Sequence, residues 1–420
     1  MSDLLSDILE NSGGAVVISQ DHNLDNINVQ AALMDENELR KMYSAEQIQA
    51  MRNDPSRMKE AKEAAIRRAN LNVTDGKVSV AFSKTGGWHG LGTVLDRNMT
   101  RQEALFHGGA NFKVEKYAVS YRYNGEWITS EGDYLFVRSD TGQALGRVGA
   151  KSQPIQNEDG SEVVDYVLGQ GNGHYSSAGV LGNGEKVWLC GDFPESRFEV
   201  VPNDTVETKL IAMIRHDGKG TTRFYPYTNR PECENTLNVS LASASAHKKG
   251  IRIRHTGDIS QKMRAAEKTL LISLAAYEQF KERAQFLVTK PVDSVLHYAN
   301  DVLDATLGVT IESLQKESDL LSKAVNLTQI EIDLQQKTIE KKLKRRVQIL
   351  EEILNNANSE SCTKNGIANT GWGAFNAVTQ YADHGLKYRG KQAEENRFES
   401  NLYGKSDEMK QIALEKILAY

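Results

Sequence analysis

Cysteine is scarce in this sequence, with only three among 420 residues. Cys190, Cys233 and Cys362 are odd in number and widely spaced, which indicates free thiols in a reducing compartment and argues against a disulfide framework. No CxxC pair and no cluster of Cys and His at ligand spacing occurs. The sequence therefore predicts no zinc site and no other metal site.

Long apolar runs are also absent. No stretch approaches the roughly 18 apolar residues that a membrane-spanning helix needs. The acidic start, Met1–Leu5, lacks the basic region and the cleavage site of a signal peptide. Hydrophobic residues make up 39% and charged residues 25% of the chain, which suits a rather polar surface. We therefore expect a soluble, cytoplasmic protein with no membrane partner.

Catalytic motifs are missing as well. The tract Gly169–Gly173 lacks the Lys-Ser/Thr ending of a phosphate-binding loop, so a flexible hairpin or loop is favoured. His216-Asp217 would suit a metal phosphohydrolase only with further ligands, and no second His/Asp pair has the right spacing; a turn through Asp217-Gly218 is favoured. We expect no cofactor, although an enzymatic site hidden in the sheet stays open.

Two other pairings have structural explanations. Asp383-His384 lies near a helix end, where capping or compensation of the helix dipole is expected. Cys233 is close in sequence to Arg230 and His216, which would activate a thiolate, but a buried structural cysteine is the favoured interpretation.

The net charge of −5 hides an asymmetry. Residues 1–75 hold 13 acidic and 8 basic residues, and the remainder is neutral overall. Within that remainder, residues 205–264 hold 11 Lys and Arg against 5 Asp and Glu. An acidic leader and a basic central segment either contact each other or meet different partners.

Patterning divides the chain into three parts and predicts an α+β fold. Residues 1–75 form an acidic helical leader, which either caps the main domain or docks on a neighbouring subunit. Residues 76–260 form a β-rich core domain that contains the basic segment. Residues 261–420 form a helical region with a long charged helix and a C-terminal packing helix. The core is therefore an antiparallel sheet, preceded and followed by helices.

Local signals place several elements of the core. Thr100 and Glu103 form a capping box for a short helix that ends at Phe106. Residues 114–123 alternate up to Asn124-Gly125, a strong hairpin turn, and residues 126–129 and 134–138 supply further strands. A second hairpin turn is expected at Asn183-Gly184, and a short helix near residues 165–168.

The region after residue 260 is nearly all helical. Helices are expected over residues 262–288 and 292–307, over a long charged stretch from 311 to 358, and from about residue 406. The charged stretch has a heptad-like seam formed by Leu321, Val325, Ile332, Ile339, Leu343, Leu350 and Leu354. This seam predicts either a helical hairpin that packs on its own domain or a contact that forms an oligomer.

The basic segment is the best candidate binding site. Lysines and arginines can neutralise phosphates, and aromatic faces can stack on unpaired bases. The alternation Ile251-Arg252-Ile253-Arg254 places both arginines on one face of a strand, opposite the isoleucines. A solvated basic strand is the alternative. The candidate nucleic-acid-binding residues are Arg215, Lys219, Arg223, Tyr225, Tyr227, Arg230, Lys248, Lys249, Arg252 and Arg254.

Two tracts that set a tryptophan among glycines lie near the ends of the globular part, at residues 86–93 and 369–384. Together with tracts between them, they resemble the phage/plasmid-like protein family, the domain of unknown function nine hundred and thirty-two. The resemblance covers residues 78–415 and leaves the leader outside it. Its tracts are Trp88–Thr93, Ser177–Leu181 with Gly184 and Val187-Trp188, His216–Gly218, Arg230 to Leu237 with Arg254–Thr256, and Asn369–His384. It implies a phage, prophage or plasmid origin and no settled activity. We expect both tryptophans to anchor the fold.

We predict a phage or plasmid protein that binds single-stranded DNA and anneals it during recombination, as a homo-oligomer in the bacterial cytoplasm. By fold-level analogy alone, the expected sheet, basic groove and helical region are similar to single-strand annealing proteins of the Rad fifty-two-like type. The alternative is a non-enzymatic host-interaction or anti-defence protein that acts through the helical seam and the leader.

Overall fold

The computed structural model describes residues 66, 70–74, 77–84, 92–230, 235–237, 251–275, 277–323, 327–389 and 393–420. The chain divides into two compact units, and all described residues belong to the one formed by residues 66–87 and 91–420. The leader helices, Trp88, Cys233, Lys248 and Lys249 lie outside the described residues.

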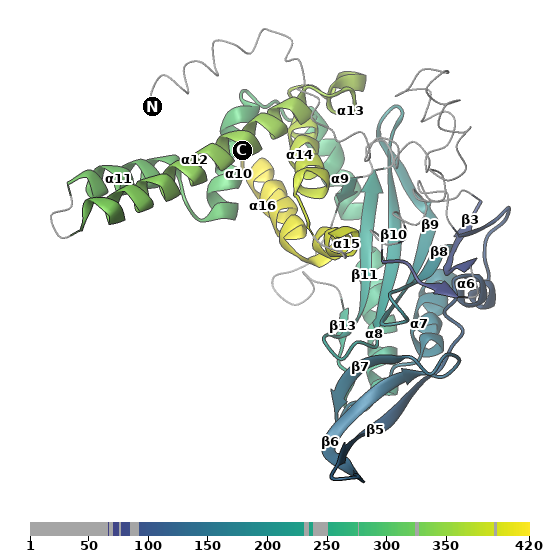
Figure 1. The fold of residues 1–420 in the computed structure, drawn as a ribbon. Helices are drawn as coiled ribbons and strands as arrows, with labels where there is room; N and C mark the ends of the chain where they lie inside the picture. Colours follow the sequence, from purple (N-terminus) through teal and green to yellow (C-terminus); the bar gives the residue numbers. More distant parts are fainter. Residues whose placement is uncertain are drawn as a thin grey trace, which may run out of the picture. The chain divides into compact units, whose positions relative to one another are not determined.

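The larger sheet has the strand order β12-β11-β10-β9-β8-β3-β4, with β13 paired to β11 (Figure 1). Its pairs are antiparallel, as expected, except that β3 and β4 run parallel. Its strands are β3 (Val80–Ser83), β4 (Thr93–Leu95), β8 (His174–Leu181), β9 (Lys186–Val201), β10 (Asp204–Arg215), β11 (Thr222–Arg230), β12 (Asn235–Leu237) and β13 (Ile251–Ile253). Two short strands, β1 (Val73–Thr74) and β2 (Lys77–Val78), pair separately.

A second sheet contains β5 (Val114–Tyr123), β6 (Glu126–Arg138) and β7 (Ala144–Gly149) in that order. Asn124 and Gly125 have φ of 48° and 90°, so the predicted two-residue turn forms with the left-handed backbone that such turns require. The two strands predicted at residues 126–129 and 134–138 are parts of one strand, β6, and they pair with β5 on either side of a register shift at which Gly132 has φ of 83°.

Three helices share a hydrophobic core with these sheets: α6 (Arg101–His107), α7 (Asn157–Gln170) and α8 (Ile259–Ala275). The predicted capping box of α6 is present, with Thr100 and Glu103 in their expected roles. The short helix expected near residues 165–168 is 14 residues long, since α7 begins at Asn157. Gly171 ends α7, so the glycine tract lies at a helix C-terminus rather than at the N-terminus that binds phosphate.

The C-terminal helices build a second core around Trp372. The stretch predicted as one helix over 262–288 is described as α8 and α9, and the stretch over 311–358 as α11 and α12. Val200 and Val206 of the sheet join this second core, so sheet and helices share packing. The helices are α9 (Tyr277–Thr289), α10 (Val295–Leu307), α11 (Ile311–Ser322), α12 (Gln329–Ala357), α13 (Glu360–Thr363), α14 (Gly371–Gln380), α15 (Ala393–Tyr403) and α16 (Lys405–Ala419), with short turns η1 (Lys364–Gly366) and η2 (Tyr381–Gly385).

The heptad-like seam is used inside the chain. Leu321 of α11 and Ile339 of α12 are buried together with Leu314, and Leu343 packs against them. Farther along α12, Leu350 enters the core around Trp372. The helices therefore form a hairpin on their own domain, which is one of the two predicted outcomes, and Figure 1 shows α11 and α12 side by side.

Trp372 anchors the fold as expected. Its side chain is fully buried, and its Nε1 donates a hydrogen bond to Asp204 Oδ2 over 2.8 Å. Asp383 is buried, and its carboxylate accepts hydrogen bonds from Lys410 Nζ over 2.7 Å and from Ser406 Oγ over 3.1 Å, both on α16; the capping or dipole role expected for Asp383-His384 stays a prediction. Among the described residues, every helix is too short or too polar to cross a bilayer.

Candidate nucleic-acid interface

Two arginines of the basic segment face each other across neighbouring strands. In the antiparallel register of β11 and β13, Arg223 lies directly opposite Arg252, so both side chains project from the same face of the sheet. Like charges in this arrangement lower the stability of a strand pair. The pair is therefore a feature that packing alone does not favour.

Arg223 lacks a conventional partner. It forms no ion pair or hydrogen bond with a described residue, and its Nε is buried without a hydrogen-bond acceptor. The guanidinium carbon lies 3.9 Å from the centre of the Tyr403 ring, so the cation is held on an aromatic face. Burial and the nearby Arg252 lower the pKa of Arg223. A bound anion would favour the charged form and raise this pKa again.

The predicted alternation of residues 251–254 is confirmed. Ile253 is buried, whereas Arg252 and Arg254 are exposed. Lys219, in the turn between β10 and β11, is exposed as well. None of these three side chains makes an ion pair with a described residue, so together with Arg223 they form what we call the basic surface.

Arg215 lies on the same side of the sheet but is neutralised. Its guanidinium is 2.5 Å from the Asp217 carboxylate and 3.3 Å from that of Glu399, on α15. The Asp217-Gly218 turn forms as predicted, with φ of 70° at the glycine. Arg215 therefore supports this turn and contributes little net charge to the basic surface.

Arg230 and Tyr225 do not fit the predicted role. Arg230 is 0% exposed and forms a buried ion pair with Asp204, and its Nη2 also donates to Ser361 O over 2.7 Å. Tyr225 is buried with its hydroxyl 3.3 Å from Asp407 Oδ2. Neither side chain can reach a nucleic acid, because both are buried: Tyr225 packs against α15 and α16, and Arg230 lies against Asp204 and α13. Tyr227 is half-buried, with its hydroxyl 3.7 Å from Cys190 Sγ.

The β5–β6 hairpin carries functional candidates that the sequence analysis did not single out. Trp127 is 74%, Tyr123 62% and Tyr121 51% exposed. The register places Trp127 opposite Arg122, and Tyr121 opposite Ile128, so both faces of the hairpin are aromatic. Solvent-exposed aromatic clusters of this kind mark interaction sites. The sequence indicates this surface only by aromatic residues close to the Asn124-Gly125 turn on both strands.

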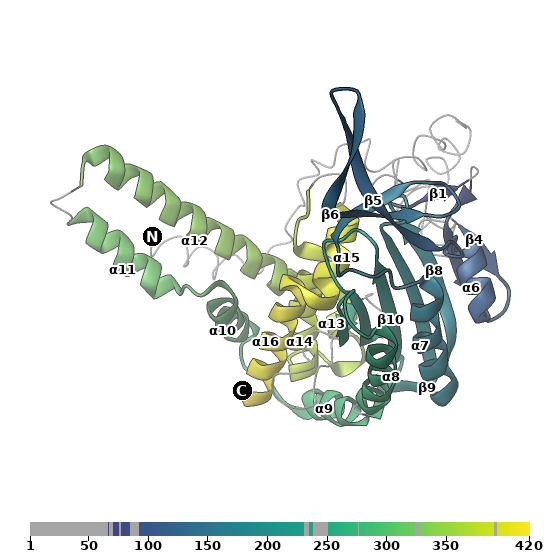
Figure 2. The same ribbon diagram turned by 90° about the horizontal axis from the view of Figure 1, so that it is seen from below.

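The root of this hairpin adjoins the basic surface. The turn at Asp217-Gly218 packs on β7, since a Cβ on Gly146 would lie 2.2 Å from the carbonyl carbon of Asp217. Lys116 of β5 donates to Ser152 O over 2.9 Å, and the neighbouring Gln153 N donates to His255 O over 2.7 Å. The turn before β11 and the segment after β13 thus contact the second sheet. The far ends of β5 and β6 extend beyond these contacts (Figure 2).

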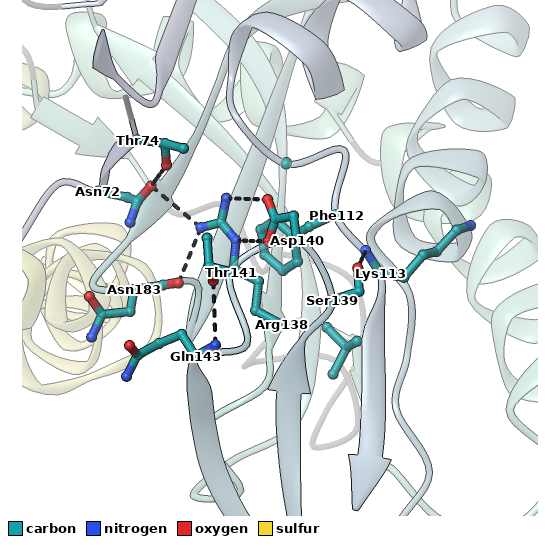
Figure 3. Close-up of polar contacts among 12 residues, drawn as sticks. Asn72, Thr74, Phe112, Lys113, Arg138, Ser139, Asp140, Thr141, Gln143 and Asn183 are labelled. Carbon is teal, nitrogen blue, oxygen red and sulfur yellow. Dashed lines mark hydrogen bonds and ion pairs between the residues drawn. The ribbon is translucent and has the colours of Figure 1, made fainter. Parts of the chain in front are cut away.

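A buried arginine fixes the other side of the hairpin root (Figure 3). Arg138, at the end of β6, donates to both carboxylate oxygens of Asp140 over 2.7 and 3.0 Å. Its Nη1 donates to Asn183 O over 3.1 Å, in the β8–β9 turn, and its guanidinium carbon lies 4.1 Å from the Phe112 ring centre. The second sheet is thereby attached to the larger one, and the hairpin has a fixed base.

His216, Cys190 and Cys362 are buried groups in the described part of the chain. His216 is buried, its Nε2 lies 2.9 Å from Asn157 Oδ1, and burial lowers its pKa to about 3, so the ring is neutral and structural. Burial likewise raises the pKa of the Cys190 and Cys362 thiols, which makes them poor nucleophiles. In the same part of the chain, no three His, Cys, Asp or Glu side chains are grouped to hold a metal ion.

Comparison with known proteins gives a family and no activity. A family model described as "Domain of unknown function (DUF932)" matches residues 144–402, more than half of the chain. The matched segment contains the basic surface and ends before the last helix, whereas the β5–β6 hairpin precedes it. No curated protein and no solved structure matches the chain.

Proposed function

The chain belongs to the DUF932 family, and on that premise we propose that it is a phage or plasmid protein that binds single-stranded DNA and anneals complementary strands during recombination. The observation that carries the proposal is the Arg223–Arg252 pair, in which two cations lie opposite each other and neither forms an ion pair with a described acidic residue. A phosphate between them would remove their repulsion and supply the missing acceptor.

Lys219 and Arg254 extend this pair into a surface of four uncompensated cations. The exposed positions of Lys219, Arg252 and Arg254 let a phosphate backbone approach without displacing an internal partner. Contacts of this kind are independent of base identity, which suits a protein that must accept any sequence.

The aromatic hairpin supplies a stacking element that Tyr225 cannot. From Lys116, at the hairpin root, to Tyr121 the strand spans about 17 Å, which a few nucleotides of extended strand can bridge. Tyr121, Tyr123 and Trp127 then offer rings to unpaired bases, with Arg122 beside the indole. We propose that the basic surface holds the backbone while bases reach the hairpin rings.

The proposed mechanism needs no cofactor. Backbone contacts leave the Watson–Crick edges free, so a complementary strand can pair with the bound one. Stacked bases are ordered and unpaired, which lowers the entropic cost of pairing. Annealing then follows from positioning alone.

An annealing assay tests the proposed function. Two complementary oligonucleotides carrying a fluorescence donor and acceptor are mixed at concentrations where spontaneous pairing is slow. We expect the protein to accelerate pairing at low salt and to do so without nucleotide or metal. Binding without acceleration would reject annealing and leave a single-strand-binding protein, and the absence of both would reject the proposal.

The stacking role predicts a selective loss. Replacing Trp127 by Ala should weaken single-stranded DNA binding by about 5- to 150-fold, corresponding to the roughly 1–3 kcal/mol of a stacked base. Because the indole is exposed, the thermal midpoint should stay unchanged. Fluorescence anisotropy with a labelled oligonucleotide measures the affinity. Phe106→Ala removes an aromatic ring that is 65% exposed from α6 and is the matched control. Equal affinities for the two variants would contradict stacking on the hairpin.

A second candidate function is contact with other proteins, as a homo-oligomer or as a non-enzymatic host-interaction or anti-defence factor. The observation that favours it is a set of three exposed apolar side chains on the α11–α12 hairpin, Leu320, Ile330 and Leu334, which are 71%, 74% and 65% exposed and which we call the apolar patch. We propose that these side chains join copies of the chain, because the seam itself is already buried.

Light scattering tests the oligomer. Replacing Leu320, Ile330 and Leu334 by Ser should convert the wild-type assembly to monomers without a change in helix content. Phe106→Ser, at an equally exposed apolar position on α6, should leave the mass unchanged. A wild type that is monomeric at all concentrations would exclude self-association and leave a host protein as the partner of the patch.

A further inference from the structure

A run of basic residues on α12 is divided by the helix into one buried and several exposed side chains. Arg346 is buried, and its Nη2 donates to Asp304 Oδ1 over 2.6 Å while its Nη1 donates to Val309 O over 3.1 Å. These bonds attach α12 to α10 and fix which face of α12 is turned inward. The other basic members of this run therefore have exposed side chains.

Four of those members form one stripe. At about 100° per residue, Lys337, Lys341, Lys344 and Arg345 lie within roughly 60° of one another's mean direction, and the buried Ile339, Arg346 and Leu350 lie on the opposite side. All four are exposed, and none forms an ion pair or hydrogen bond with a described residue. We call this set the α12 stripe.

The stripe is poorly compensated by neighbouring acids. Lys337, Lys341 and Arg345 are spaced four residues apart, an arrangement of like charges that weakens a helix. Asp333 lies one turn before Lys337, Glu340 lies beside Lys337 and Lys344, and Glu352 lies about 10 Å beyond Arg345 along the axis, but none of these acids forms an ion pair with the four cations in the described part of the chain. A polyanion is the partner that this charge arrangement fits.

We propose that the α12 stripe binds the sugar–phosphate backbone of double-stranded DNA. From Lys337 to Arg345 the helix rises about 12 Å, which matches three to four phosphates along one strand of a duplex. The stripe carries no aromatic residue to stack on unpaired bases, so it suits a backbone-only contact. It extends the proposed function, on which it rests, from the single strand at the sheet to the duplex that annealing produces.

Duplex and single-strand affinities, measured separately, test the stripe. The variant Lys337→Glu, Lys341→Glu, Lys344→Glu, Arg345→Glu should bind a 30-base-pair duplex about 100-fold more weakly or worse. For duplex binding, the slope of log K against log salt should be smaller in magnitude by about 3 to 4 for this variant than for the wild type. Single-strand affinity should follow the matched control, Lys77→Glu, Lys268→Glu, Lys405→Glu, Lys416→Glu, which makes the same charge change at exposed lysines elsewhere.

Each other outcome decides against the stripe. A wild type that ignores duplex at low salt, or equal duplex affinities for the stripe and control variants, overturns the inference. If the stripe variant loses affinity for duplex and single-stranded DNA equally, the α12 stripe makes general phosphate contacts instead. Stripe-dependent binding to phosphatidylserine vesicles without duplex binding assigns it to a membrane surface. The proposed function fails separately, if single-stranded DNA is not bound while the duplex is.

Discussion

Reversing the three exposed charges of the basic surface should abolish single-stranded DNA binding. The variant Lys219→Glu, Arg252→Glu, Arg254→Glu removes three charge-assisted contacts, each worth roughly 1.5–3 kcal/mol, and places a glutamate opposite Arg223. The affinity should fall by about 100-fold or more. Fluorescence anisotropy at 50 mM salt measures it. The three side chains have no described partner, so the fold should tolerate the change.

The control for this result is a variant with the same charge change elsewhere. Lys268→Glu, Lys405→Glu, Lys416→Glu lie at exposed positions on α8 and α16. This variant should lose only the few-fold affinity that a more negative protein loses through long-range repulsion. If both triple variants bind alike, the basic surface does not contact DNA.

Replacing Arg230 by Ala should have the largest effect on stability. The change leaves the Asp204 carboxylate fully buried, with the Trp372 indole as a remaining donor, and an uncompensated buried charge costs about 3–5 kcal/mol. Urea denaturation followed by circular dichroism measures the loss. At a low temperature, at which the Arg230→Ala variant remains folded, it should bind DNA like the wild type.

Two companion variants make this prediction specific. Arg230→Leu combined with Asp204→Leu removes both charges and should recover part of the loss, since apolar pairs often replace buried ion pairs at little cost. Arg254→Ala, at an exposed position, should change stability by less than about 0.5 kcal/mol. A similarly small loss for Arg230→Ala would contradict the buried pair, and a selective loss of DNA affinity would restore Arg230 to the binding site.

Local signals in the sequence were sufficient for several elements. The capping box at Thr100 and Glu103, the Asn124-Gly125 turn and the burial of Trp372 depend on neighbouring residues or on helical spacing, and each was predicted. The α+β class and the antiparallel pairing of most strands followed from turn spacing in the same way. The parallel β3–β4 pair was missed, because no local pattern specifies the direction of a neighbouring strand.

The candidate site was harder to predict, because alternation does not say what covers each face. Arg223 and Arg230 lie on the same strand, yet Arg230 contacts Asp204 and Ser361, which are 26 and 131 residues away. Arg215 is neutralised by its neighbour Asp217 and by Glu399, which is 184 residues away. Burial by helices that are distant in sequence therefore decides which basic side chains remain accessible. Local sequence patterns do not contain that information.

The aromatic hairpin was missed for the opposite reason. Sequence patterns identify strands by the face that they bury, and Tyr121, Tyr123 and Trp127 bury neither face. Only the absence of covering elements among the described residues marks them as a surface.

The salt dependence of wild-type binding to single-stranded DNA tests the central claim most directly. Four contacts from Lys219, Arg223, Arg252 and Arg254 predict a slope of log K against log salt of about −3, or about −4 if Lys248 and Lys249 also contribute. Affinity should thus fall by roughly 50-fold or more between 50 and 200 mM salt. A purified protein that does not bind single-stranded DNA at 50 mM salt, or binds it with a slope near zero, would contradict the proposed nucleic-acid interface.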